Sequence, residues 1–110
     1  MNDAWIVIGN ASGDVSYGVD ESYYIFGIYK TRQEAQNALD KFNNCEEYVK
    51  VSPDNEILAM DDYGCIVSRT EEEIKNDNNI DILKHNDLNY FVVHFINGIP
   101  VFCCGVGYLE

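Results

Sequence analysis

Basic residues are scarce in this chain: seven Lys and Arg stand against nineteen Asp and Glu, so its 110 residues carry a formal net charge of -12. A surface this negative repels nucleic acid and anionic membranes and attracts basic partners. The few basic residues are also scattered along the chain, so they cannot form the stripe that nucleic-acid-binding proteins present. We therefore expect neither nucleic acid nor a membrane to be a direct partner.

Targeting signals and paired cysteines are lacking too. No stretch approaches the roughly 20 apolar residues of a membrane span, and residues 1–3 lack the basic segment of a signal peptide. The four cysteines form no C-x-x-C pair, which favours small, reduced, apolar side chains over redox or zinc chemistry at Cys45, Cys65, Cys103 and Cys104. These absences predict a cytoplasmic protein.

Catalytic and ligand-binding motifs are missing as well. Residues 9–14 contain glycines after a strand-like run, but no Lys follows and no helix begins there, which excludes a phosphate loop. Residues 77–81 begin like a calcium loop, yet the required Gly and bidentate Glu do not follow. His85 and His94 have no acid or cysteine at ligand or triad spacing. We therefore expect no enzyme, no metal and no cofactor.

Apolar and aromatic residues are abundant. They make up 46% and 13% of the chain, with eight Tyr and five Phe, whereas a disordered acidic tail would be poor in both. At this length the sequence predicts a single folded domain spanning residues 1–110.

The clearest helix signal covers residues 31–43. Thr31 and Glu34 have the spacing of a capping box. Behind them, one apolar stripe at helical spacing is formed by Ala35, Ala38, Leu39 and Phe42.

Strand-like runs lie on both sides of this helix. Residues 4–9 and 22–29 predict a hairpin whose tip, residues 10–21, is a long irregular loop rich in Gly, Ser and Asp. After the helix we expect strands at residues 47–52, 56–60 and 63–69 and a turn at residues 53–55. Residues 70–75 predict one helical turn or a structured loop, and residues 76–79 a break.

The strongest turn signal is Asn97-Gly98, the preferred pair for a two-residue type I′ turn. It predicts a hairpin of residues 89–96 and 99–105 in which Phe95 faces Pro100. Because Pro100 has no N–H to donate to a further neighbour, the second strand is expected at the edge of its sheet.

Both faces of the predicted strands are apolar, with Trp5 and Val7 on one face and Ile6 and Ile8 on the other. We expect an α+β fold: an antiparallel sheet of about four to six strands with one amphipathic helix, about residues 31–43, packed on one face. The rest of the sheet must curl into a barrel-like shape, be covered by loops, or meet another chain. Self-association as a homodimer is favoured on this ground.

Residues 25–39, IFGIYKTRQEAQNAL, resemble a strand-to-helix element common in small bacteriophage and mobile-element proteins, of the form G-[IV]-Y-x-[ST]-x-x-E-A-x-x-A. This resemblance implies a capped helix after a strand and no activity. The small size, strong acidity and lack of chemical motifs are also similar to phage-encoded inhibitors of host defence, including anti-CRISPR proteins and DNA mimics. That group implies a host-cell cytoplasmic location and is defined by role, so no functional residue carries over.

The preferred function is a non-enzymatic protein that binds and inhibits a basic, nucleic-acid-handling host protein. Carboxylates can imitate a phosphate track, because β-strand residues rise by about 3.3 Å and duplex DNA carries one charge per about 3.4 Å of axis on each strand. Tyrosines add rigid contact area. The expected partner-binding residues are Asp61, Asp62, Tyr63, Glu71, Glu72 and Glu73.

Two alternatives stay open. One is an oligomeric sponge for a small molecule or signalling nucleotide, which would need basic residues such as Lys30, Arg32 or Arg69 brought together by folding. The other is a structural or immunity-type accessory protein, for instance a partner of a basic toxin.

Overall fold

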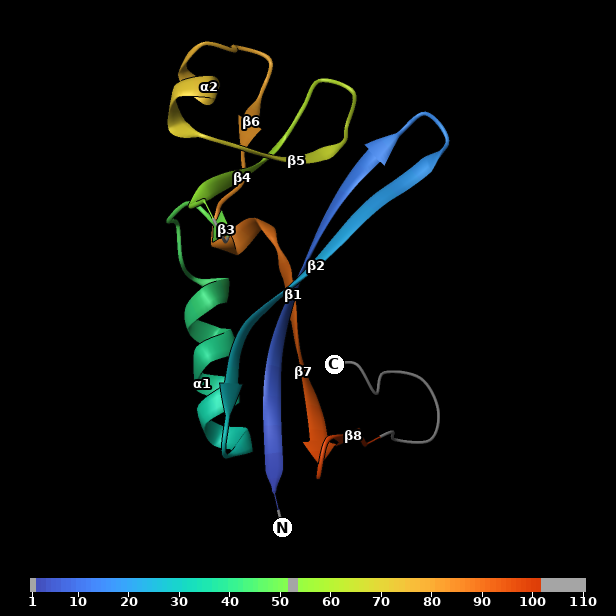
Figure 1. Cartoon of the computed structure of the whole chain (residues 1–110), viewed down its shortest axis with the longest axis vertical. Helices are drawn as coiled ribbons and strands as arrows, with labels where there is room; N and C mark the ends of the chain where they lie inside the picture. Colours follow the sequence, from blue (N-terminus) through green and yellow to red (C-terminus); the bar gives the residue numbers. More distant parts are fainter. Residues whose placement is uncertain (1, 52–53, 102–110) are drawn as a thin grey trace.

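The structure, a computed structural model, describes residues 2–51 and 54–101. Within these residues eight strands form two antiparallel sheets (Figure 1). The first sheet has the strand order β2-β1-β7-β8, and its strands are β1 (Asp3–Val15), β2 (Gly18–Tyr29), β7 (Asn89–Ile96) and β8 (Ile99–Pro100). The second has the order β3-β4-β5 with β6 also paired to β4, and its strands are β3 (Lys50–Val51), β4 (Glu56–Met60), β5 (Ile66–Arg69) and β6 (Asp81–Ile82). The predicted α+β class is confirmed, with more strands than expected because a second sheet is present.

The β1–β2 hairpin is longer and more regular than predicted. Its ladder continues to a two-residue turn at Ser16 and Tyr17, so the expectation of an irregular loop over residues 10–21 is wrong. The Gly and Asp residues that indicated a loop make contacts with the second sheet. The backbone of Gly13 lies against that of Gly64, and the Ile66 N–H donates a hydrogen bond of 2.7 Å to Asp20 Oδ2.

A β-bulge in β2 directs an aromatic ring toward the helix. The register between β1 and β2 shifts after Val7, which leaves Phe26 without a partner in the ladder. The Phe26 ring covers Gly9, where any larger side chain would collide with it. The ring centroids of Phe26 and Phe42, on the helix, are 5.4 Å apart.

The main helix, α1 (Arg32–Asn43), confirms the predicted position. Thr31 is the N-cap and accepts a hydrogen bond of 3.2 Å from the Glu34 N–H. Ala35 is fully buried and the other three residues of the predicted stripe are partly buried against β7 and β1.

The second sheet agrees with the sequence in part. β4 has the predicted bounds, whereas β3 and β5 are shorter and β6 was not expected. Of the two alternatives for residues 70–75, the helical turn is present as α2 (Glu71–Lys75), and its Thr70 cap forms a complete capping box with Glu73. Asp54 and Asn55 form the expected turn before β4. Pro53, which also belongs to that turn, and Ser52, at the end of the expected strand, lie outside the described residues.

The C-terminal hairpin has the predicted turn and register. Asn97 and Gly98 have φ values of 51° and 81°, as a type I′ turn requires. Phe95 pairs with Pro100, and β8 is an edge strand. The expected continuation to residue 105, which includes Phe102, Cys103 and Cys104, lies outside the described residues.

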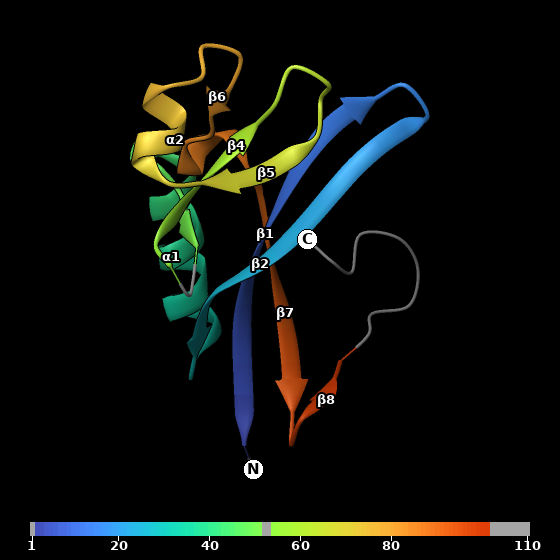
Figure 2. The ribbon, with the colours of Figure 1, turned by 45° about the horizontal axis from the view of Figure 1, so that its top comes forward.

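In the described part of the chain, helix and second sheet pack on the same face of the first sheet, called here the packed face (Figure 2). The ladder register places Val7, Ala11 and Tyr90 on this face. The core that joins it to the second sheet consists of Ala11, Val49, Leu58 and Leu88, with the 3-10 helix η1 (His85–Asp87) beside it. The opposite face is called the open face.

Gly64 should be more sensitive to substitution than another glycine with the same backbone conformation. Gly64 and Gly98 have φ values of 83° and 81°, so alanine at either position costs about 1–2 kcal/mol in backbone strain. A Cβ at Gly64 would also collide with the backbone of Asp14, whereas one at Gly98 meets no atom nearby. Urea denaturation should show that Gly64→Ala lowers the free energy of unfolding by about 1–3 kcal/mol more than Gly98→Ala. Equal losses would contradict the close contact of the two sheets.

Candidate functional site

Charge is concentrated at one end of the molecule. Residues 46–87, which form the second sheet, α2 and η1, contain twelve acidic and four basic residues, a net charge of -8. The tip of the β1–β2 hairpin adds Asp14, Asp20 and Glu21, bringing the net charge of this region to -11 of the total -12. We call this region the acidic end; it forms the upper part of Figure 1, opposite β8 and the start of α1.

The first three predicted site residues lie in the turn between β4 and β5. Asp61 Oδ1 accepts hydrogen bonds from the N–H groups of Tyr63 (3.0 Å) and Cys65 (2.9 Å), so this carboxylate holds the turn together. Asp62 is exposed, and Tyr63 is 77% exposed. Asp62 and Tyr63 are therefore available to a partner, while Asp61 positions them.

The other three predicted residues form the first turn of α2. Glu73 Oε1 accepts hydrogen bonds from the Thr70 N–H and hydroxyl at 3.0 and 3.1 Å. These bonds lower the pKa of the Glu73 carboxyl below its usual range. Glu71 and Glu72 are exposed at the surface. Glu73 thus fixes the helix start, and its two neighbours face solvent.

The two groups do not form one cluster. They lie beyond opposite ends of β5, a strand of four residues that is roughly 13 Å long. Tyr63 instead lies near the hairpin tip, where it lines a hollow of about 400 Å³ together with Tyr17, Asp20 and Cys65. Tyr17 is 98% exposed. Burial, with Asp61 and Asp20 nearby, raises the pKa of the Cys65 thiol.

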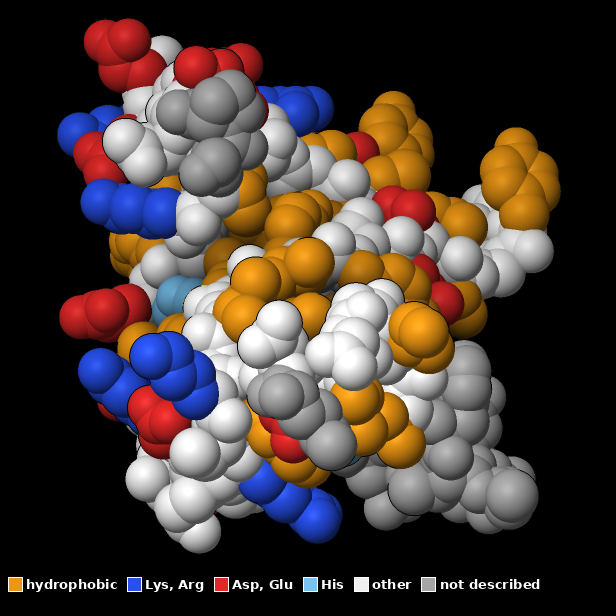
Figure 3. Space-filling view, turned by 60° about the horizontal axis from the view of Figure 1, so that its bottom comes forward, with side chains coloured by type: hydrophobic (Ala, Val, Ile, Leu, Met, Phe, Trp, Pro, Cys, Tyr) orange, Lys and Arg blue, Asp and Glu red, His pale blue; other side chains and the backbone are white. Residues whose placement is uncertain are grey.

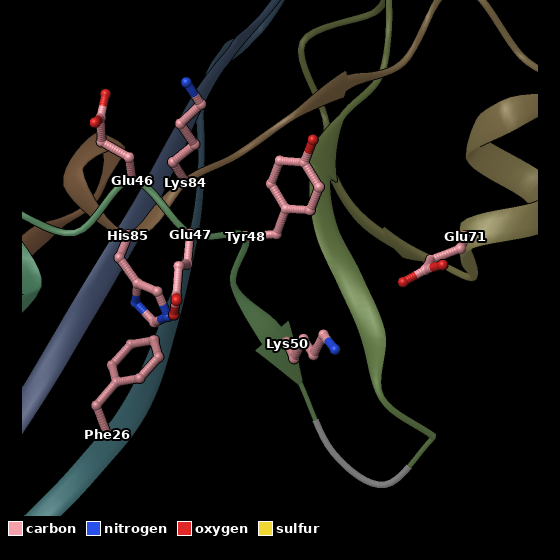
Figure 4. A pocket seen from close by; sticks show the side chains of 8 residues that line it. All are labelled: Phe26, Glu46, Glu47, Tyr48, Lys50, Glu71, Lys84 and His85. Atoms are coloured by element: carbon pink, nitrogen blue, oxygen red, sulfur yellow. The ribbon is translucent and has the colours of Figure 1, made fainter.

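A larger hollow of about 820 Å³ lies between η1, β3 and α2 (Figure 4). Its lining carries three carboxylates and two ammonium groups beside aromatic side chains, from Phe26, Glu46, Glu47, Tyr48, Lys50, Glu71, Lys84 and His85. Glu47 is directed beside the His85 ring, whereas Glu46 and Lys84 point away from it. Most of these side chains are exposed, so the hollow does not gather acid and base groups around one point.

His85 is a structural histidine inside an aromatic cluster that the sequence did not reveal. Its Nδ1 is 2.9 Å from the Tyr90 hydroxyl, and its ring stacks on Phe42 with centroids 5.2 Å apart. Burial lowers the pKa of the His85 imidazole, and Glu47 offsets part of this effect. Burial also raises the pKa of the Tyr90 hydroxyl far above its ordinary value. The cluster joins α1, β2, β7 and η1, and burial disfavours the charged form of both His85 and Tyr90.

His94 meets an acid that is distant in sequence. Its ring stacks on Trp5 with centroids 3.6 Å apart, and its Nε2 lies 3.7 Å from Asp3 Oδ2. This separation is too long for a hydrogen bond, and Nε2 has no hydrogen-bond partner within the described residues. The expectation that no acid accompanies the histidines holds for sequence spacing and fails in three dimensions, because β1 and β7 are adjacent strands.

The basic residues are held apart. Lys30 and Arg32 lie at the start of α1, whereas Arg69 lies in β5 at the acidic end and donates from Nη1 to the Ser68 carbonyl at 2.8 Å. The phosphate site considered for these three residues is therefore not assembled. Among residues 2–51 and 54–101, no three His, Cys, Asp or Glu side chains come together as metal ligands, and no helix has the length and apolarity to cross a membrane.

His85 should make stability fall as the pH is lowered below neutrality. Its pKa is lower in the folded chain than the ordinary 6.5, so the unfolded chain takes up the proton more readily. The stabilisation is complete above the unfolded pKa and is lost as the pH falls through the folded pKa. Urea denaturation between about pH 7.5 and pH 5.5 should therefore show a declining free energy of unfolding.

The variant His85→Gln should show a shallower decline over this interval. An unchanged slope in His85→Gln would show that other groups cause the decline.

Known proteins give no guide to this site. No protein-family model, curated protein or solved structure matches the chain. What the acidic end and its two hollows do must therefore be inferred from their own geometry and charge.

Proposed function

We propose that this chain is a non-enzymatic inhibitor that binds a basic, nucleic-acid-handling protein of a bacterial host through its acidic end. The observation that carries this proposal is the segregation of charge, because the acidic end (residues 46–87 and the β1–β2 tip) has a net charge of -11 of the total -12. An evenly spread charge would give solubility alone, whereas a concentrated one attracts and orients a positively charged partner.

The contact surface in this proposal has two parts. Asp62 and Tyr63 project from the β4–β5 turn, and Glu71 and Glu72 project from the start of α2. They stand at opposite ends of β5, a strand roughly 13 Å long, and each strand of duplex DNA presents several phosphates over that length of helix axis, one per about 3.4 Å. A groove that holds duplex DNA presents basic side chains at such intervals, so both parts can be engaged by one partner.

Asp61 and Glu73 contribute indirectly. Each accepts two hydrogen bonds from its own turn or cap, so it fixes the direction of the neighbouring exposed carboxylates. Tyr17 and Tyr63 both line the smaller hollow, and the two exposed rings offer flat surfaces to arginine or lysine side chains of the partner. A role of this kind places the protein in the cytoplasm of the host cell.

The experiment is a capture from nuclease-treated bacterial lysate with the full chain immobilised. The captured protein should be basic, should be released by added salt, and should be displaced by duplex DNA, since the chain and DNA compete for one groove. Capture that duplex DNA leaves unchanged would contradict mimicry and favour an accessory or immunity-type partner.

Charge-reversal variants distinguish the effect of the acidic end on binding from the effect of the total net charge. Asp62→Lys and Glu72→Lys should each weaken binding of the captured protein about tenfold, equivalent to about 1.4 kcal/mol. Asp40→Lys makes the same change in net charge on α1, outside the acidic end, and should have little effect. Equal losses in all three variants, measured by calorimetry, would show that net charge alone governs binding.

A further inference from the structure

The open face of the first sheet carries continuous rows of apolar side chains. The register pairs Ile6 with Ile28 on one side and with Val93 on the other, so these three residues form one row. Ile8 pairs with Ile25 and Phe91 and forms the next. Helix and second sheet both pack on the opposite face, so within the described residues no other element lies over these rows.

Exposure and composition of these rows are unusual for a surface. Ile25 and Ile28 are 66% and 67% exposed, and neighbouring Tyr23 is 58% exposed. No charged side chain stands in either row; within β1, β2 and β7 the charged residues on this face are Asp14 and Glu21, toward the hairpin tip. In Figure 3 hydrophobic side chains gather across the middle of the visible surface, and most charged ones lie along one side.

The area fits a subunit interface. An isoleucine that is two-thirds exposed leaves on the order of 100 Å² of apolar surface in water. The two rows with Tyr23 therefore expose several hundred Å², the size of the largest apolar patch on a typical monomer, and such a patch often marks an interaction site. Each subunit of a specific dimer typically contributes about 800 Å².

We propose that the open face binds a second copy of this chain, forming a two-fold dimer in which the two sheets stack face to face. Rows of branched side chains interdigitate in such packings, with sheets about 10 Å apart. In a two-fold arrangement the row of Ile25, Ile8 and Phe91 meets the row of Ile28, Ile6 and Val93 of the partner subunit. The same patch then serves both subunits.

The charge distribution favours a second copy of this chain as the partner that covers the open face. A basic partner would find no carboxylate in the rows, and an anionic membrane is repelled by a net charge of -12. Two copies also repel each other, but the open rows lie toward the nearly neutral end of the molecule. Antiparallel stacking places the two acidic ends at opposite ends of the dimer, where their repulsion is weakest.

The test is the mass of the full chain in solution, measured by sedimentation across a dilution series. The expected result is twice 12.5 kDa, with a dimer dissociation constant that decreases as salt is added because repulsion is screened. Ile25→Lys and Ile28→Lys should each raise this constant about 100-fold or more, since each would bury an unpaired charge. Both side chains are exposed in one subunit, so circular dichroism should show unchanged folding.

Ile99→Lys is the matched control. Ile99 is 68% exposed in the same sheet, but its pairing with Ile96 places it on the packed face, so this variant should leave the dissociation constant unchanged. A wild-type chain that stays monomeric at every concentration overturns the proposal. So does a dimer that Ile25→Lys and Ile28→Lys leave intact. No basic partner is present in this measurement, so its outcome is independent of the proposed function.

Discussion

The close approach of the Gly13 and Gly64 backbones determines how the two sheets meet. It lets the distal half of the β1–β2 hairpin lie against the β4–β5 turn, where Asp20 accepts the Ile66 N–H. A side chain at either glycine would push the sheets apart and expose the core around Leu58. The acidic end exists as one region because this contact holds the hairpin tip beside the second sheet.

The elements that pack on the first sheet cover only one of its faces and leave the other face exposed. Helix α1 and the second sheet both cover the packed face, and the bulge at Phe26 turns one more ring toward it. The isoleucines of the open face therefore stay exposed, while most carboxylates lie at the acidic end. Anionic and apolar surfaces are thereby separated, so the chain has two surfaces of different chemistry.

The acidic residues divide into two kinds. Asp20, Asp61 and Glu73 accept backbone hydrogen bonds and hold the sheet contact, a turn and a helix start. Asp62 and Glu72 are exposed and contribute to the negative potential. A charge count treats all of these residues alike, although removing the first kind weakens the fold and removing the second kind changes the surface.

Structural features that depend on neighbouring residues could be predicted from the sequence. The Thr31 cap with its apolar stripe gave the bounds of α1, and Asn97-Gly98 gave a turn and its register, because capping and positive φ values are decided within a few residues. The extended hairpin tip, the contact of His94 with Asp3 and the cluster around His85 were decided by tertiary structure. Each joins segments far apart in sequence, so a glycine that indicates a loop locally becomes a strand residue once another backbone packs against it.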